Sequence, residues 1–154
     1  MVNVPTGVWI NEQGRIVRPG ETAYTTSRTT NFGGKTITTE GEIYVAALRD
    51  WVANGARSQY VVTPEEYARR VKPRTPAERE ADAAFQLGVY FHEAGKKELA
   101  EKYWQRAQSL NPDDWNYHRQ EWSFTPQDAG RRWLEKFRGL GDRPYYPPLD
   151  MPKR

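Results

Sequence analysis

Strand-forming residues gather at the start of this chain, and helix-forming patterns occupy the rest of it. β-branched apolar residues lie on both sides of a turn, Asn11–Gly14. They predict a β-hairpin of Gly7–Asn11 and Arg15–Arg18, with Trp9 beside its apolar face and Pro19-Gly20 ending the second strand. A run of strands followed by a run of helices is typical of an α+β fold.

The segment after this hairpin has neither a helical nor a clear strand period. Residues 20–40 are rich in Thr, Gly and Ser. They predict a long loop with at most one short strand, at Lys35–Thr38.

Six helices are predicted beyond this loop. Three of them share one start signal, a threonine N-cap followed by proline at the first helical position, at Thr63-Pro64, Thr75-Pro76 and Thr125-Pro126. Apolar residues at helical spacing and closing Gly or Asn residues define the extents. The predicted helices cover residues 41–54, 63–71, 75–94, 97–110, 116–124 and 126–139.

A break at Lys72-Pro73-Arg74 predicts a boundary between two parts of the chain. Residues 1–72 then hold the hairpin, the long loop and two helices, and residues 73–142 form an all-helical region. Residues 143–154 are a Pro-rich tail, which we expect to lie extended on the surface.

Composition excludes several function classes. The 154 residues contain no cysteine and only two histidines, so disulfides, zinc–thiolate sites, iron–sulfur clusters and a cysteine nucleophile are excluded. No apolar stretch is long enough to span a membrane. The net charge of +3 is spread evenly along the chain, which argues against nucleic-acid binding. We predict no catalytic residues, no cofactor and no metal site.

Residues 81–114 resemble one tetratricopeptide repeat (TPR), the helix–turn–helix unit of that length. Small residues occupy positions where two antiparallel helices must approach closely, and aromatic residues fill the space between them. The one departure is Ala84, where the family usually has Trp. The TPR-like packing positions are Leu87, Gly88, Phe91, Ala100, Trp104, Ala107 and Pro112.

The resemblance implies that the first helix of the pair lines a concave surface. The residues on that face would be Asp82, Gln86, Val89, His92 and Glu93. They lack the Asn and Lys or Arg residues with which this family clamps a peptide carboxylate. Two interpretations stay open: the helix pair is an interaction surface, or it is only a packing or spacer element. A single repeat also needs neighbouring elements to cover its faces.

A second resemblance covers the first fifty residues. Val4-Pro5-Thr6, followed by a hairpin and a helix, is similar to the C-terminal half of a thioredoxin-like fold of the TlpA/ResA-like type. The resemblance implies that Pro5 is the cis-proline and that Val4 and Thr6 contact substrate. Any other hairpin-plus-helix in an α+β domain is the alternative interpretation.

The redox motif of that family is missing. Its Cys-x-x-Cys lies upstream of the cis-proline, whereas only four residues precede Pro5 and the chain has no cysteine. The expected function is therefore a non-catalytic protein–protein interaction or assembly module. The alternative is the C-terminal part of a thiol–disulfide oxidoreductase whose redox half is encoded upstream.

The expected partners are another protein or further copies of this chain. A thioredoxin-like sheet that begins at Val4–Asn11 has an uncovered edge, which favours a homodimer or higher assembly. No signal peptide is visible, which predicts a cytoplasmic protein for the chain as given and an extracytoplasmic one if it is part of a longer TlpA/ResA-like protein.

Overall fold

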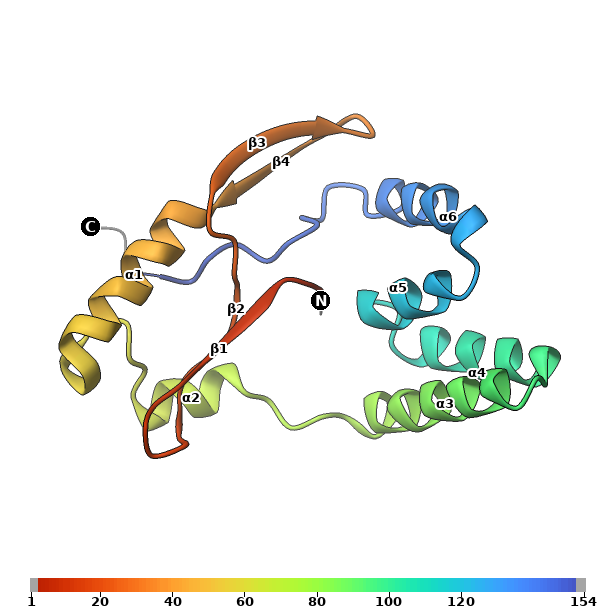
Figure 1. Cartoon of the computed structure of the whole chain (residues 1–154), viewed down its shortest axis with the longest axis horizontal. Coiled ribbons are helices and arrows are strands. Elements are labelled where there is room, and N and C mark those ends of the chain that lie inside the picture. The colour runs from red at the N-terminus through yellow and green to blue at the C-terminus, as the bar shows by residue number, and fades with distance from the viewer. Residues whose placement is uncertain (1–2, 152–154) are drawn as a thin grey trace. The chain divides into compact units, whose positions relative to one another are not determined.

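The computed structural model describes residues 3–151, which form two compact units. One, the mixed unit, consists of residues 5–72 and 140–151; the other, the helical unit, consists of residues 3–4 and 73–139. Two small antiparallel hairpins and six helices place the chain in the α+β class (Figure 1).

The mixed unit begins with the expected hairpin. Its strands are β1 (Thr6–Ile10) and β2 (Ile16–Thr22), which pair antiparallel. The prediction that Pro19-Gly20 ends the second strand is wrong. Gly7 pairs with Glu21 and Trp9 with Arg18, so Pro19 and Gly20 lie together opposite one residue of β1 in a β-bulge. A bulge accepts proline because it leaves the ladder without a donor there.

The predicted long loop over residues 20–40 is also wrong, although the short strand predicted at Lys35–Thr38 lies within an observed strand. β2 runs to Thr22, and β3 (Ser27–Phe32) and β4 (Lys35–Glu40) form a second two-stranded antiparallel sheet. Gly33 and Gly34 have φ of 57° and 81°, the conformation that a two-residue hairpin turn requires. The threonines are β-branched and favour strands, so the sequence contained a hairpin signal that its polar composition obscured.

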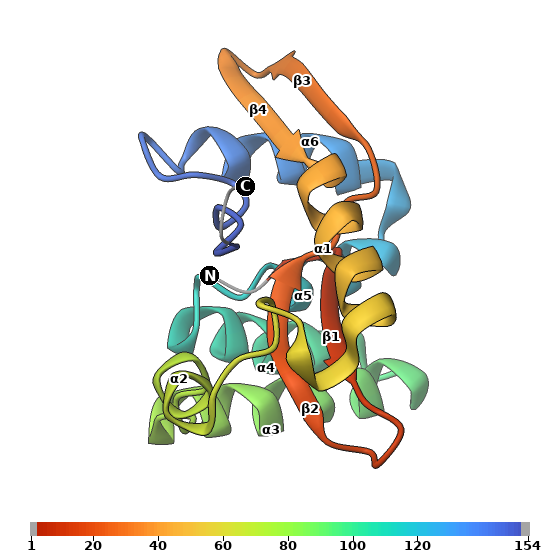
Figure 2. The ribbon, with the colours of Figure 1, turned by 90° about the vertical axis from the view of Figure 1, so that its left-hand side faces the viewer.

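The helix α1 (Gly41–Asn54) packs against β1 and β2 (Figure 2). Trp9 is buried between them: its ring stacks on Trp51 at 5.0 Å, and its indole N–H donates to the Tyr44 hydroxyl at 3.1 Å. A 3₁₀ turn at Gly55–Arg57 and the short helix α2 (Pro64–Arg70) follow. The tail has no helix or strand over residues 140–151, and its Met151 completes this core.

The helical unit contains α3 (Pro76–Glu93), α4 (Lys97–Leu110), α5 (Trp115–Ser123) and α6 (Pro126–Arg138). These bounds confirm the predicted helices to within a residue or two. Thr75 and Glu78 form a capping box at the start of α3, and Gly95 turns the chain at φ 74° between α3 and α4. The core lies between α3, α4 and α5 and consists of Ala81, Ala84, Phe85, Ala100, Trp104, Ala107 and Tyr117.

Candidate functional site

The predicted TPR-like positions lie along the contact between α3 and α4, with two exceptions. Gly88, Ala100, Trp104 and Ala107 are buried, and Phe91 stacks on Tyr103 with ring centroids 5.4 Å apart. Leu87 is 42% exposed. Pro112 is exposed after α4, where its carbonyl accepts a hydrogen bond from Lys136 at 2.8 Å.

The surface expected to be concave is largely covered by the segment that follows α4. The Tyr117 hydroxyl donates to the Asp82 carboxylate, and His92 packs on Phe124 with centroids 4.3 Å apart. Val89 contacts the same core, while Gln86 and Glu93 are exposed. Burial of the Tyr117 hydroxyl and its bond to Asp82 raise the pKa of Tyr117 to about 12. This face therefore serves packing within the helical unit.

A different face of the same helix pair is open. Between α3 and α4 runs a shallow groove of about 700 Å³. Ala83, Ala84, Leu87 and Tyr103 form its apolar surface, and polar side chains flank them. They are Glu80, Lys102, Gln105, Arg106 and Ser109.

Charge on the rim of this groove is unbalanced. Glu80 and Arg106 pair across it at 2.6 Å, and both are exposed. Lys102 has no ion-pair partner among residues 3–151, so one positive charge is left over at the rim. None of the polar rim residues was predicted from the sequence as part of a site. Ala83 and Leu87 lie one turn apart on α3, and this spacing could have indicated an apolar surface there. The TPR resemblance instead implies a binding surface on the opposite face of α3.

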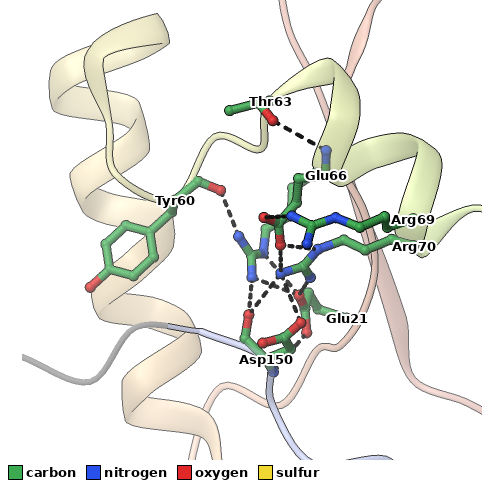
Figure 3. Close-up of polar contacts among 8 residues, drawn as sticks. Glu21, Tyr60, Thr63, Glu66, Arg69, Arg70 and Asp150 are labelled. Atoms are coloured by element: carbon green, nitrogen blue, oxygen red, sulfur yellow. Dashed lines mark hydrogen bonds and ion pairs between the residues drawn. The ribbon is translucent and has the colours of Figure 1, made fainter.

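The mixed unit contains a buried ion network (Figure 3). Arg18 of β2 is only 2% exposed, and its guanidinium donates to the Glu21 carboxylate at 2.9 Å and to the Tyr60 carbonyl at 2.6 Å. It also donates to the carbonyl of Asp150 in the tail. A buried guanidinium is costly unless all its donors are bonded, and here the tail supplies one of the acceptors.

Arg70 of α2 extends this network to the surface. Its guanidinium forms ion pairs with the buried Glu21 at 3.0 Å, with Glu66 at 2.7 Å and with the Asp150 carboxylate at 2.8 Å. The hydrogen bond from Arg70 lowers the pKa of Glu66. The network joins β2, α2 and the tail, and every charge in it is compensated. Its role is structural: it holds these three segments together.

The predicted cis-proline region is exposed. Val4, Pro5 and Thr6 all lie at the surface, and the Pro5 carbonyl accepts a bond from the Ala23 N–H at 3.3 Å. No group of three or more His, Asp or Glu side chains that could hold a metal occurs among residues 3–151. None of the helices described is long and apolar enough to cross a membrane.

His118 of α5 is half-buried beside Trp122, and its Nε2 has no hydrogen-bond partner within the described part of the chain. Burial, together with the positive charges of Lys136 and Arg132, lowers the pKa of His118 to about 4. The ring is therefore neutral near pH 7.

Comparisons of this chain with family models, with curated proteins and with solved structures found no match.

Proposed function

We propose that this chain is a non-catalytic protein–protein interaction module, and that the groove between α3 and α4 holds an amphipathic helix of a partner protein. The observation that carries the proposal is the open apolar surface of Ala83, Leu87 and Tyr103 beside polar rim residues. An apolar strip with a polar rim is the surface that a helix with i, i+3 and i+4 anchors fits.

The rim charges indicate which helix this groove would select. Arg106 is already paired with Glu80, whereas Lys102 is unpaired. A helix that carries an acidic side chain next to its apolar stripe would compensate Lys102. Such a pair at an exposed rim affects association rate and specificity more than affinity.

The position of the groove supports the same function. The α5 segment contacts Asp82 and His92, on another face of α3, so it leaves the groove free within the helical unit. The resemblance of residues 81–114 to a tetratricopeptide repeat also favours protein contact, although the groove differs from the surface that the family uses.

Selection from a displayed library of helical peptides tests this proposal. We expect enrichment of amphipathic helices with an acidic residue beside the apolar stripe. Leu87→Glu should abolish their binding, since it places a charge in the apolar strip. The matched control is Leu99→Glu: Leu99 is 38% exposed on α4 but does not line the groove. Failure to enrich any helix, or binders that Leu87→Glu leaves unaffected, would contradict the proposal.

One observation favours the alternative function, the C-terminal part of a thioredoxin-like oxidoreductase. α1 covers one face of β1–β2 through Trp9, while Val8, Ile10 and Ile16 are exposed. Apolar residues on both faces are typical of a strand buried between two layers. Sequencing upstream of the Met1 codon tests this: an in-frame segment with a Cys-containing redox motif would support it, and a ribosome-binding site directly before Met1 would contradict it.

A further inference from the structure

We infer that the outer edge of β3 pairs with β3 of a second copy of this chain, so that two hairpins form one four-stranded antiparallel sheet. This inference is independent of the α3–α4 groove. It starts from the β3–β4 hairpin, which Figure 1 shows as a separate two-stranded ribbon leading into α1. Two strands alone are marginally stable in water, and each has one unpaired edge.

The two edges of the hairpin differ. β4 is partly covered: Lys35 donates to the Gly141 carbonyl of the tail, and Thr38, Thr39 and Glu40 line a 360 Å³ pocket with tail residues. All six residues of β3 are exposed. Proline and charged side chains commonly blunt an edge; β3 contains no proline, and Arg28 is its one charged residue. The free edge is therefore that of β3.

The register determines which backbone groups this edge presents. The two-residue turn closes on the pair Phe32–Lys35, and Thr30 pairs with Ile37. Hydrogen-bonded and non-hydrogen-bonded pairs alternate in an antiparallel ladder. Counting from the turn, the N–H and C=O groups of Thr29 and Asn31 point away from β4, toward the outer edge.

This edge is complementary to itself. With a two-fold axis at Thr30, Thr29 of one copy lies opposite Asn31 of the other, and these residues exchange the outward N–H···O=C bonds. Arg28 then lies opposite Phe32, which is 44% exposed, and a guanidinium over an aromatic ring is attractive. No like charges face each other directly, and the closed two-fold pairing leaves no further β3 edge for a third copy.

A single introduced cysteine tests this pairing, because the chain has none of its own. Thr30 would face its own copy as a non-hydrogen-bonded pair with Cα atoms about 4.5 Å apart. That distance is within the range that a disulfide spans. We expect Thr30→Cys to form a covalent dimer on mild oxidation at micromolar concentration. Thr38→Cys, on β4, is the matched control and should stay largely monomeric.

A second pair of variants separates edge pairing from hairpin stability. Thr29→Pro removes an outward N–H of β3, and Thr38→Pro removes the corresponding outward N–H of β4. Sedimentation of the full chain should show a dimer that Thr29→Pro abolishes and Thr38→Pro preserves, with similar thermal melts for both. A monomeric parent chain, equal crosslinking of both cysteine variants, or a dimer lost only in Thr38→Pro would each overturn the inference.

Discussion

Gly88 of α3 lies directly against the indole ring of Trp104 in α4, so that no Cβ fits between them. A Cβ placed on Gly88 would overlap Cδ1 and Nε1 of the ring. The ring has little room to move away, because Phe124 stacks on it at 5.2 Å and 7°. The close contact between α3 and α4 at this point therefore depends on the absence of a side chain at residue 88.

We expect Gly88→Ala to destabilise the chain by roughly 1–3 kcal/mol, although alanine favours helices, because the methyl group overpacks this contact. Gly130→Ala is the matched control, since nothing lies within 4 Å of a Cβ at Gly130 in α6. That variant should stabilise by roughly 0.5–1 kcal/mol through helix propensity. Urea unfolding of both measures the difference; equal shifts for the two variants would disprove the packing argument.

The tail depends on the buried Arg18. Replacing Arg18 with Met leaves the buried Glu21 with Arg70 as its remaining ionic partner and removes the donor to the Asp150 carbonyl. We expect a loss of about 3 kcal/mol, since the buried Glu21 carboxylate is then only partly compensated, by Arg70. Arg131→Met is the control: Arg131 pairs with Asp128 and Glu135 at the surface, so its loss should cost less than about 1 kcal/mol.

Proteolysis provides an independent test of whether the ion network holds the tail in place. Cleavage within residues 143–149 should accelerate in Arg18→Met and not in Arg131→Met. Unchanged cleavage together with unchanged stability would contradict the assigned role of Arg18.

Stability should fall as the pH is lowered from about 6.5 to about 4. In this window the unfolded chain protonates His118, whose ordinary pKa is 6.5, whereas the folded chain, with its pKa of about 4, does not. Below pH 4 both states are protonated and this contribution no longer changes. Because the ring is only half-buried, we expect about 2 kcal/mol over the window rather than the full value of the shift.

The variant His118→Leu isolates this effect from the titrating carboxylates. Unfolding free energies of both proteins, measured at half-unit steps of pH, should diverge between pH 6.5 and pH 4 in favour of the variant. A constant difference across this range would mean that the His118 pKa is not lowered in the folded chain.

This chain should not reduce disulfides, because it contains no thiol that could act as the attacking nucleophile. Insulin turbidity with dithiothreitol measures this activity. Reduction above the dithiothreitol background by the purified chain would contradict the prediction.

Sequence alone determined the features that depend on neighbouring residues. Thr63 and Thr75 cap their helices through hydrogen bonds to N–H groups three residues later, and proline follows each of them. Such signals are local, so the helix boundaries could be predicted closely. The β1–β2 hairpin was predicted for the same reason, from a turn between β-branched residues.

The second hairpin shows where local signals were present but were outweighed. Gly33-Gly34 is a strong turn signal, yet the threonine-rich flanks have no apolar alternation, and alternation is the usual evidence for a strand. All of β3 is exposed, so neither of its faces requires apolar residues, and the strand has no alternation of apolar and polar residues.

Tertiary structure alone decided the candidate site and the ion network. Arg18 and Asp150 are 132 residues apart, and no spacing in the sequence connects them. The groove exists because α5 covers the face of α3 that holds Asp82 and leaves Ala83 and Leu87 exposed to solvent. Asp82, Ala83 and Leu87 all lie on α3, whose sequence has a continuous helical periodicity. Which of its faces is buried depends on where the following helices pack, and that is a property of the folded chain.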